Sequence, residues 1–278
     1  MRGVASLRNW RVVVGGGLIL LLVVCAVFAP YLAPYDPLDQ DLAGQLAPPD
    51  WRFAAGGHFL GADSLGRDVL SRLIWGSRVA LTVALVAGTL TALLGTLLGL
   101  AAGFFGGALD ALISRAVDVW SAFPPVLLSI ILVALLGTGL WSVVVAIVVI
   151  DWTRFCRVVR AETLKQRRMD YVTAATVAGL TPRAILWREV LPNLLPLTLV
   201  LLTLEMGIAV VVEAILSFVG LSISSDTPSW GGMIAEGRGV VHEGPWVLTG
   251  ALLVLLATVL GFNLLGDGLK AELDPVLR

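Results

Sequence analysis

The sequence predicts an all-α polytopic membrane protein with six transmembrane helices. Hydrophobic residues make up 58% of the 278 residues and charged residues only 14%, and the mean hydropathy is +0.92. A chain of this composition has too little polar surface to cover a soluble fold. Its apolar runs approach or exceed the roughly 20 residues that cross about 30 Å of hydrocarbon as a helix, and they lack the alternation of a membrane-spanning β-strand.

Six uncharged or nearly uncharged runs are the predicted spans. They are residues 12–29, 79–105, 119–136, 140–150 with a few residues beyond, 194–221 and 246–265. The first is expected to be an uncleaved signal anchor rather than a cleaved signal peptide, because it is long and Pro30 follows it directly. Pro124 and Pro125 are expected to kink the third span at its cytoplasmic start. A turn at Gly137 to Gly139 separates it from the fourth.

Basic residues predict the orientation, because Lys and Arg are enriched in cytoplasmic loops. Arg2, Arg8 and Arg11 precede the first span. The connection between the fourth and fifth spans holds a second basic group: Arg154, Arg157, Arg160, Lys165, Arg167, Arg168, Arg183 and Arg188. Both regions, and with them both chain termini, are therefore expected in the cytoplasm, with residues 30–76 outside.

The chain is expected to divide into three parts. Residues 1–77 hold an N-terminal cytoplasmic tail, the first span and an extracytoplasmic segment, residues 78–268 form a core of five spans, and residues 269–278 form a cytoplasmic tail. Residues 61–76 mix apolar and charged side chains, which predicts a short amphipathic helix at the outer interface with Trp75 at headgroup depth.

Small residues recur every four positions in the second span, at Gly95, Gly99 and Gly103. Such a face lets two helices approach closely in lipid. Packing within one subunit is the favoured interpretation, and a dimer interface is the alternative.

The connection at residues 160–192 carries the signals of two short helices. Gly179 can end the first in a left-handed cap, Thr181 and Pro182 can begin the second, and Pro192 is expected to end it. The first helix presents a face of small residues, formed by Ala174, Ala175, Ala178 and Gly179. Physical reasoning alone leaves two interpretations open: insertion into a groove on another protein, or an interfacial helix that only joins two spans.

Ionisable residues inside a span are costly, so Glu205 and Glu213 are candidates for function. They lie eight residues apart, on one face of the fifth span, and Asp151 lies near the end of the fourth. An acidic strip can line a passage for peptide ammonium groups or a cation. Alternatively, Glu213 forms hydrogen bonds at a subunit interface and Glu205 is a packing residue.

Several kinds of site are excluded by composition. The net charge of −1 gives no basic excess for nucleic acid. Cys25, Cys156, His58 and His242 do not form a metal-ligand or disulfide pattern. The sequence lacks both the Gly-x-x-x-x-Gly-Lys-Ser/Thr loop that cradles phosphates and the His-Glu-x-x-His motif of a zinc hydrolase. We therefore expect no metal site, no bound cofactor and no catalytic residues.

Against this background the motifs carry a resemblance. Thr173, Ala174 and Ala175, then Gly179, and Pro192 thirteen residues later resemble the coupling-loop signature of binding-protein-dependent ABC importer permeases. The rest of the chain resembles the C-type subunit of the dipeptide, oligopeptide and nickel permease family, through blocks at residues 60–68, 103–107, 123–124, 213–220, 228–231, 262–267 and 273–275. One departure is Thr173, where the family signature commonly begins with Glu.

The resemblance implies a type I ABC importer permease fold and a translocation subunit that is not an enzyme. It implies a heterodimer with a B-type permease subunit, one or two cytoplasmic ATP-binding subunits that hold ATP and Mg²⁺, and an extracytoplasmic substrate-binding protein. The location implied is the cytoplasmic (inner) membrane of a bacterium or archaeon.

The resemblance also suggests site residues. Contact with the ATP-binding subunits is expected at Thr173, Ala174, Ala175, Ala178, Gly179 and Pro192. An extracytoplasmic gate or binding-protein contact is expected at Asp63, Arg67, Asp68 and Trp230. The expected substrates are dipeptides or oligopeptides, with nickel or another small solute as the alternative. A proton-coupled secondary transporter using Glu205 and Glu213 is the rival function.

Overall fold

The computed structural model describes residues 9–51, 57–222 and 227–273, and among these the regular structure is helical. Arg2, Arg8 and the C-terminal residues from 274 onward lie outside the described residues. The helices are α1 (Trp10–Val27), α2 (Ala29–Leu32), α3 (Val69–Phe105), α4 (Gly107–Ser121), α5 (Pro125–Leu136), α6 (Leu140–Gln166), α7 (Asp170–Val177), α8 (Pro182–Ile185), α9 (Leu191–Phe218), α10 (Trp230–Gly239) and α11 (Pro245–Leu273). A 3₁₀ turn covers Leu42–Gly44 and a π turn covers Leu186–Val190.

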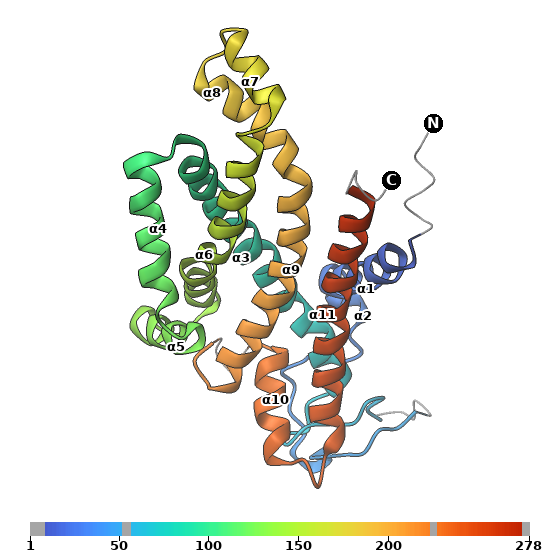
Figure 1. Ribbon diagram of the computed structural model, residues 1–278. Helices are drawn as coiled ribbons and strands as arrows, with labels where there is room; N and C mark the ends of the chain where they lie inside the picture. Colours follow the sequence, from blue (N-terminus) through green and yellow to red (C-terminus); the bar gives the residue numbers. More distant parts are fainter. Residues whose placement is uncertain (1–8, 52–56, 223–226, 274–278) are drawn as a thin grey trace.

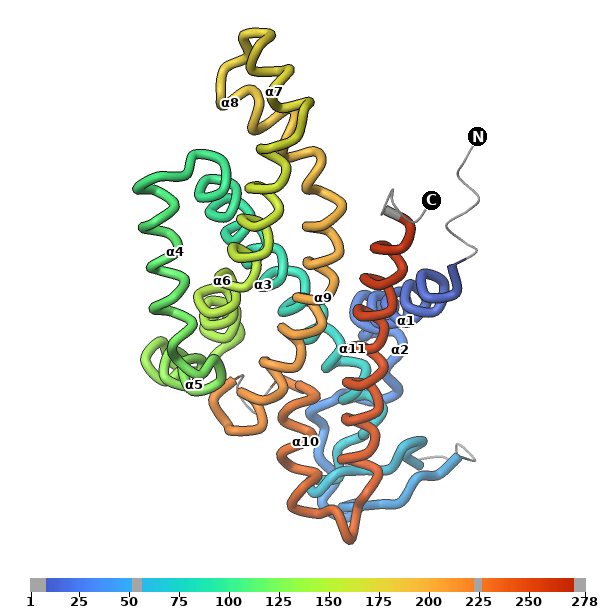
Figure 2. The backbone as a smooth tube through the Cα atoms, viewed as in Figure 1, coloured from blue at the N-terminus to red at the C-terminus, as the bar shows by residue number. Residues whose placement is uncertain are grey.

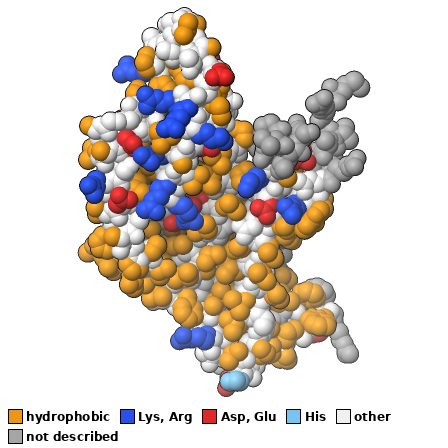
Figure 3. All heavy atoms as spheres, in the orientation of Figure 1, with side chains coloured by type: hydrophobic (Ala, Val, Ile, Leu, Met, Phe, Trp, Pro, Cys, Tyr) orange, Lys and Arg blue, Asp and Glu red, His pale blue; other side chains and the backbone are white. Residues whose placement is uncertain are grey.

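Figure 1 shows α7 and α8 projecting from one end of the molecule, with α10 and the loop that precedes α3 at the other end. Between these ends, the long helices α3, α6, α9 and α11 form the body. On the face seen in Figure 3, Lys and Arg side chains gather toward the α7–α8 end, and hydrophobic side chains dominate below them. This distribution suits a helical bundle that crosses a membrane.

By length and apolarity, four helical runs in the described part of the chain can cross a membrane: Trp10–Val27, Val69–Phe105, Pro182–Phe218 and Pro245–Glu272. The pair α4 and α5 gives a fifth if it counts as one span. The predicted fourth span forms the first half of α6. The 27 residues of α6 are long enough to cross a membrane. Asp151, Arg154 and Arg157 make this helix more polar than the four runs named above.

The predicted third span over residues 119–136 is broken at its prolines rather than only kinked, and its helix begins earlier, at Gly107. Helix α4 ends at Ser121, α5 begins at Pro125, and the two are bent by 89°. Consecutive prolines explain the break, because each lacks a backbone N–H and each disfavours helical geometry at the residue before it. Pro124 accordingly has extended backbone, with ψ of 122°.

The predicted separate amphipathic helix at residues 61–76 is also replaced by a different arrangement. Residues from Val69 onward are the first turns of α3, which continues for 37 residues to Phe105. Gly76 does not interrupt it, because the indole of Trp230 packs against this position, where an added Cβ would lie 2.7 Å from a ring carbon. The end of α3 at Phe105 matches the prediction.

The glycine face of the second span packs within the subunit, as predicted. A Cβ added at Gly99 would lie 2.7 Å from the carbonyl oxygen of Cys156 in α6, and one added at Gly103 would lie 2.7 Å from Thr163. Glycine is therefore required for the close approach of α3 and α6. This contact holds α3 directly against α6.

The loop that precedes α3 is held against the end of the bundle, as the smooth tube in Figure 2 shows beside α10 and α11. Trp246 at the start of α11 donates its indole N–H to the carbonyl of Ala62 at 2.9 Å. The backbone N–H of Tyr35 donates to the hydroxyl of Ser71 at 3.0 Å. These bonds fix the loop to helices that are distant in sequence.

Candidate functional site

The first candidate site is the α7–α8 segment, whose turn is built as the sequence predicts. Gly179 has φ of +82°, which favours glycine because other residues meet a steric penalty there. The N–H of Leu180 donates to the carbonyl of Ala175 at 3.1 Å, and that of Gly179 to Thr176 at 3.0 Å. This pair of bonds is the Schellman motif that ends a helix.

The next helix begins with the predicted cap. The Thr181 hydroxyl accepts a hydrogen bond from the N–H of Ala184 at 3.3 Å, and Pro182 occupies the first turn of α8. These features fix the angle at which α8 leaves the turn.

Pro192 does not end the second helix, so that prediction is wrong. A π turn over Leu186–Val190 leads from α8 directly into α9. The wider π hydrogen bond runs from the N–H of Leu191 to the carbonyl of Leu186. The Asn193 side chain donates to the carbonyl of Glu189 at 2.7 Å. Pro192 has no backbone N–H to donate within the helix. The helix continues through it because the π turn and the Asn193 side chain supply other hydrogen bonds to nearby carbonyl groups.

The predicted coupling residues differ in how exposed they are. Thr173, Ala174, Ala178 and Gly179 are exposed, and so is Pro192 on α9. Ala175 is half-buried against the cluster that holds Val172, Ile185 and Val190. Sequence reasoning missed Val177, which is 84% exposed beside the alanines. The sequence could have indicated it, because Val177 is a larger apolar residue four places after Thr173 and so lies on the same helix face as the small residues.

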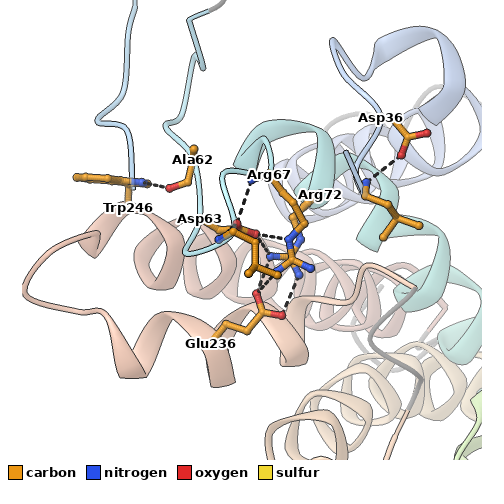
Figure 4. A network of polar contacts seen from close by, with 9 residues as sticks. Asp36, Ala62, Asp63, Arg67, Arg72, Glu236 and Trp246 are labelled. Carbon is orange, nitrogen blue, oxygen red and sulfur yellow. Dashed lines mark hydrogen bonds and ion pairs between the residues drawn. The ribbon is translucent and has the colours of Figure 1, made fainter. Parts of the chain in front are cut away.

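The second candidate site is a cluster of four charged residues at the opposite end, shown in Figure 4. Asp63 accepts from Arg67 Nε at 2.7 Å and also from Arg72. Glu236 on α10 accepts from Arg67 Nη2 at 2.8 Å and from Arg72 Nη1 at 2.6 Å. Asp63, Arg67 and Arg72 are buried, and the side chain of Glu236 is 33% exposed. Two carboxylates therefore balance two guanidinium groups.

The cluster and its neighbours bind the loop to α3 and α10. Asp68 caps α3 by accepting from the N–H of Ser71 at 2.7 Å, and it lies 3.0 Å from His58 Nδ1. Trp230 donates its indole N–H to the carbonyl of Leu73 at 2.9 Å. Asp68 and Trp230 are both buried, so they position the loop and α10 rather than form the exposed surface at this end of the molecule. Glu236 was not among the residues predicted from the sequence. It is the acidic residue of α10, the short helix that begins within the Pro228–Gly231 block.

The third candidate site lies between α6 and α9. Glu205 is 2% exposed, and it lies beside the same guanidinium group, that of Arg154, as Asp151. Arg154 lies 2.8 Å from Asp151 and 3.6 Å from Glu205. One carboxylate oxygen of Glu205, Oε1, has no hydrogen-bond partner among the described residues. The arrangement joins two carboxyl groups to one guanidinium.

Glu213 lies apart from this group, although it shares a helix with Glu205. Its Oε1 accepts from the hydroxyl of Ser217 at 2.6 Å and from that of Ser222 at 3.4 Å. Ser217 in turn lies 3.3 Å from the hydroxyl of Ser229, which caps α10. Glu213 is 2% exposed. Its contacts join the end of α9 to the start of α10.

Comparison with known proteins agrees with this architecture. Residues 95–278 match the family described as "Binding-protein-dependent transport system inner membrane component". Residues 7–49 match the "N-terminal TM domain of oligopeptide transport permease C". The chain is similar in fold to the permease in a structure of the inward-facing MetNI methionine ABC transporter. The TM-score is 0.60 at 22% identity, over 73% of this chain and 96% of that one.

Relatives cover almost the whole chain. The Di/tripeptide transport system permease protein DppC of Pseudomonas aeruginosa is 41% identical over 95% of this chain and 88% of its own length. The Dipeptide transport system permease protein DppC of Haemophilus influenzae is 37% identical over 98% and 92%. The Glutathione transport system permease protein GsiD of Pectobacterium atrosepticum is 38% identical over 98% and 89%. This chain is therefore a permease subunit and belongs to the family of inner membrane components of binding-protein-dependent transport systems.

Proposed function

We propose that this permease subunit imports dipeptides or oligopeptides and that it is driven through the exposed face of α7. Its relatives are named for dipeptides, di- and tripeptides, and glutathione, which is itself a tripeptide. In this proposal a B-type permease completes the translocation path, and an extracytoplasmic binding protein delivers the peptide. One or two ATP-binding subunits hold ATP and Mg²⁺ and supply the energy.

The observation that carries the proposal is the shape of α7. The helix presents Ala174, Ala178 and Gly179 outward next to the exposed Val177, at the end of the molecule that projects beyond the long helices (Figure 1). Exposed apolar side chains on a helix that ends in a Schellman motif favour a protein contact over a flexible connector. The missing family acid at Thr173 leaves apolar packing as the main source of affinity.

The proposed orientation places α7, α8 and both termini in the cytoplasm and the four-residue charged cluster outside. The basic residues toward the α7–α8 end support it, since Lys and Arg favour the cytoplasmic side (Figure 3). The loop that precedes α3 and α10 then face the binding protein. Glu236, the most exposed member of the charged cluster, is the residue proposed to meet it. The membrane in this proposal is the inner membrane of a bacterium or archaeon.

The test changes the α7 face and leaves the rest of the complex intact. Ala178→Asp should lower peptide-stimulated ATP hydrolysis more than about tenfold in the complex reconstituted with its binding protein, because an unpaired charge would be buried in the contact. Ala161→Asp is the matched control, since Ala161 is an exposed alanine on α6 outside the α7 face. Normal stimulation in Ala178→Asp, with all subunits assembled, would refute docking through α7.

A further inference from the structure

A half-open cavity of about 220 Å³ lies between α3 and the turn that follows α8. Four side chains of α3 line it, among them Leu97 and Phe105. From the other side it is lined by Arg183, Leu186 and Trp187. The cavity is apolar apart from Arg183, so it suits a hydrocarbon chain better than a polar solute.

The rim of this cavity belongs to the exposed apolar surface of the helices. Leu97 is 42% exposed, Phe105 is 47% exposed and Trp187 is 53% exposed. Leu97 and Phe105 lie in the last turns of the long uncharged run of α3, which ends at Phe105. In the orientation proposed above, this end is at the cytoplasmic boundary of the hydrocarbon. A tryptophan at that depth is typical of the membrane–water interface.

The charges around the cavity are mostly positive. Arg183 lines it, and Arg167 lies beside Gly106 at the end of α3. Among the described residues, the ion pairs include neither of these arginines nor Arg188 on the π turn. The carboxylate of the π turn, that of Glu189, does not line the cavity. Arginines without acidic partners beside an apolar groove are complementary to an anionic headgroup.

We propose that this groove binds an anionic phospholipid of the cytoplasmic leaflet. One acyl chain lies between α3 and Trp187, and the guanidinium of Arg183 binds the phosphate. Because Arg183 lies on α8 and Trp187 lies within the π turn, the lipid contacts the element that joins α8 to α9. The site depends on the proposed orientation but not on the identity of the transported solute or on docking through α7.

The test uses the assembled transporter in phosphatidylcholine vesicles that contain a lipid with brominated acyl chains, which quench nearby tryptophan. The signal is the quenching that is lost in Trp187→Phe, which separates this indole from the other tryptophans. Brominated phosphatidylglycerol should reach half-maximal quenching at about a fivefold lower mole fraction than brominated phosphatidylcholine, the preference expected for one basic side chain near an anionic lipid.

Three variants test the role assigned to Arg183. Arg183→Gln should abolish the preference for the anionic lipid, and Arg183→Lys should retain most of it. Arg168→Gln is the matched control, because Arg168 is also exposed, has no ion pair among the described residues and does not line the cavity. Equal quenching by the two lipids in the unaltered protein would overturn the proposal. So would an equal loss in Arg168→Gln and Arg183→Gln, or the absence of any Trp187-dependent quenching, which would mean that protein covers the groove.

Discussion

Replacing Asp63 by Asn removes the carboxylate at the centre of the four-residue charged cluster. One oxygen of Asp63 accepts from the backbone N–H groups of Leu65 and Arg67 at 2.8 and 3.0 Å. The other accepts from the guanidinium groups of Arg67 and Arg72. Asparagine can keep the two backbone bonds with its carbonyl oxygen. Its amide N–H₂ then faces the two guanidinium groups, and no hydrogen bond forms because both sides are donors.

The expected cost follows from the burial of the partners. Removing one member of a buried ion pair costs about 3–5 kcal/mol. Glu236 still balances one of the two arginines, so we expect about 3 kcal/mol, which corresponds to a fall in melting temperature of roughly 6–12 °C. The assay is thermal unfolding of the purified protein in detergent. Lys165→Gln is the control, because the pair with Glu162 joins a lysine side chain that is 63% exposed and should be worth less than about 1 kcal/mol.

A double variant separates charge balance from simple loss of contacts. Asp63→Asn combined with Arg72→Gln restores one carboxylate for one guanidinium, so its cost should be smaller than the sum of the single costs by about 0.5–3 kcal/mol. Strict additivity would refute the idea that the cluster acts as a balanced unit. A loss for Asp63→Asn no greater than that for Lys165→Gln would refute its burial as the source of stability.

Two further predictions concern the membrane-embedded helices. Gly99→Leu should lower the stability by about 1–3 kcal/mol through overpacking against α6. Gly16→Leu is the control, because an added Cβ there meets open space, and it should change the stability by less than about 0.5 kcal/mol. Similar melting temperatures for the two variants would contradict the close packing of α3 and α6. Arg154→Gln leaves the carboxyl groups of Asp151 and Glu205 without a cation and should cost about 1–3 kcal/mol. Glu205→Gln leaves one carboxylate for one guanidinium and should cost less, and the reverse order would contradict this pairing.

Features determined by neighbouring residues could be predicted from the sequence. The left-handed conformation of Gly179 and the cap at Thr181 follow from residues within one turn of each position. The packing of Gly95, Gly99 and Gly103 against another helix follows from their spacing, since small residues on one face are useful only where a partner comes close. The partner itself, α6, could not be read from that spacing.

Features that depend on distant residues could not be predicted. The side chains of Arg72 and Glu236 pair across 164 positions, and no local pattern relates them. The burial of Asp63 likewise depends on α10, so its charge suggested an exposed contact rather than an internal one. The π turn was missed for a different reason. Pro192 is a strong signal that a helix ends, and the tertiary contacts of Val190 and Leu194 in the core hold the chain helical in spite of it.

The helix that leaves the α7–α8 segment also reaches the opposite end of the molecule. The run Pro182–Phe218 is helical over 37 residues, which at about 1.5 Å per residue is roughly 55 Å. At its far end the hydroxyl of Ser217 lies 3.3 Å from that of Ser229, the cap of α10, and α10 carries Glu236 into the charged cluster. The π turn is an irregular point near the start of the run, so bending is expected to concentrate there. If a partner docks on α7 as proposed, its movement would be expected to bend this helical run at the π turn, which contains Trp187, while the far end of the run stays fixed to α10.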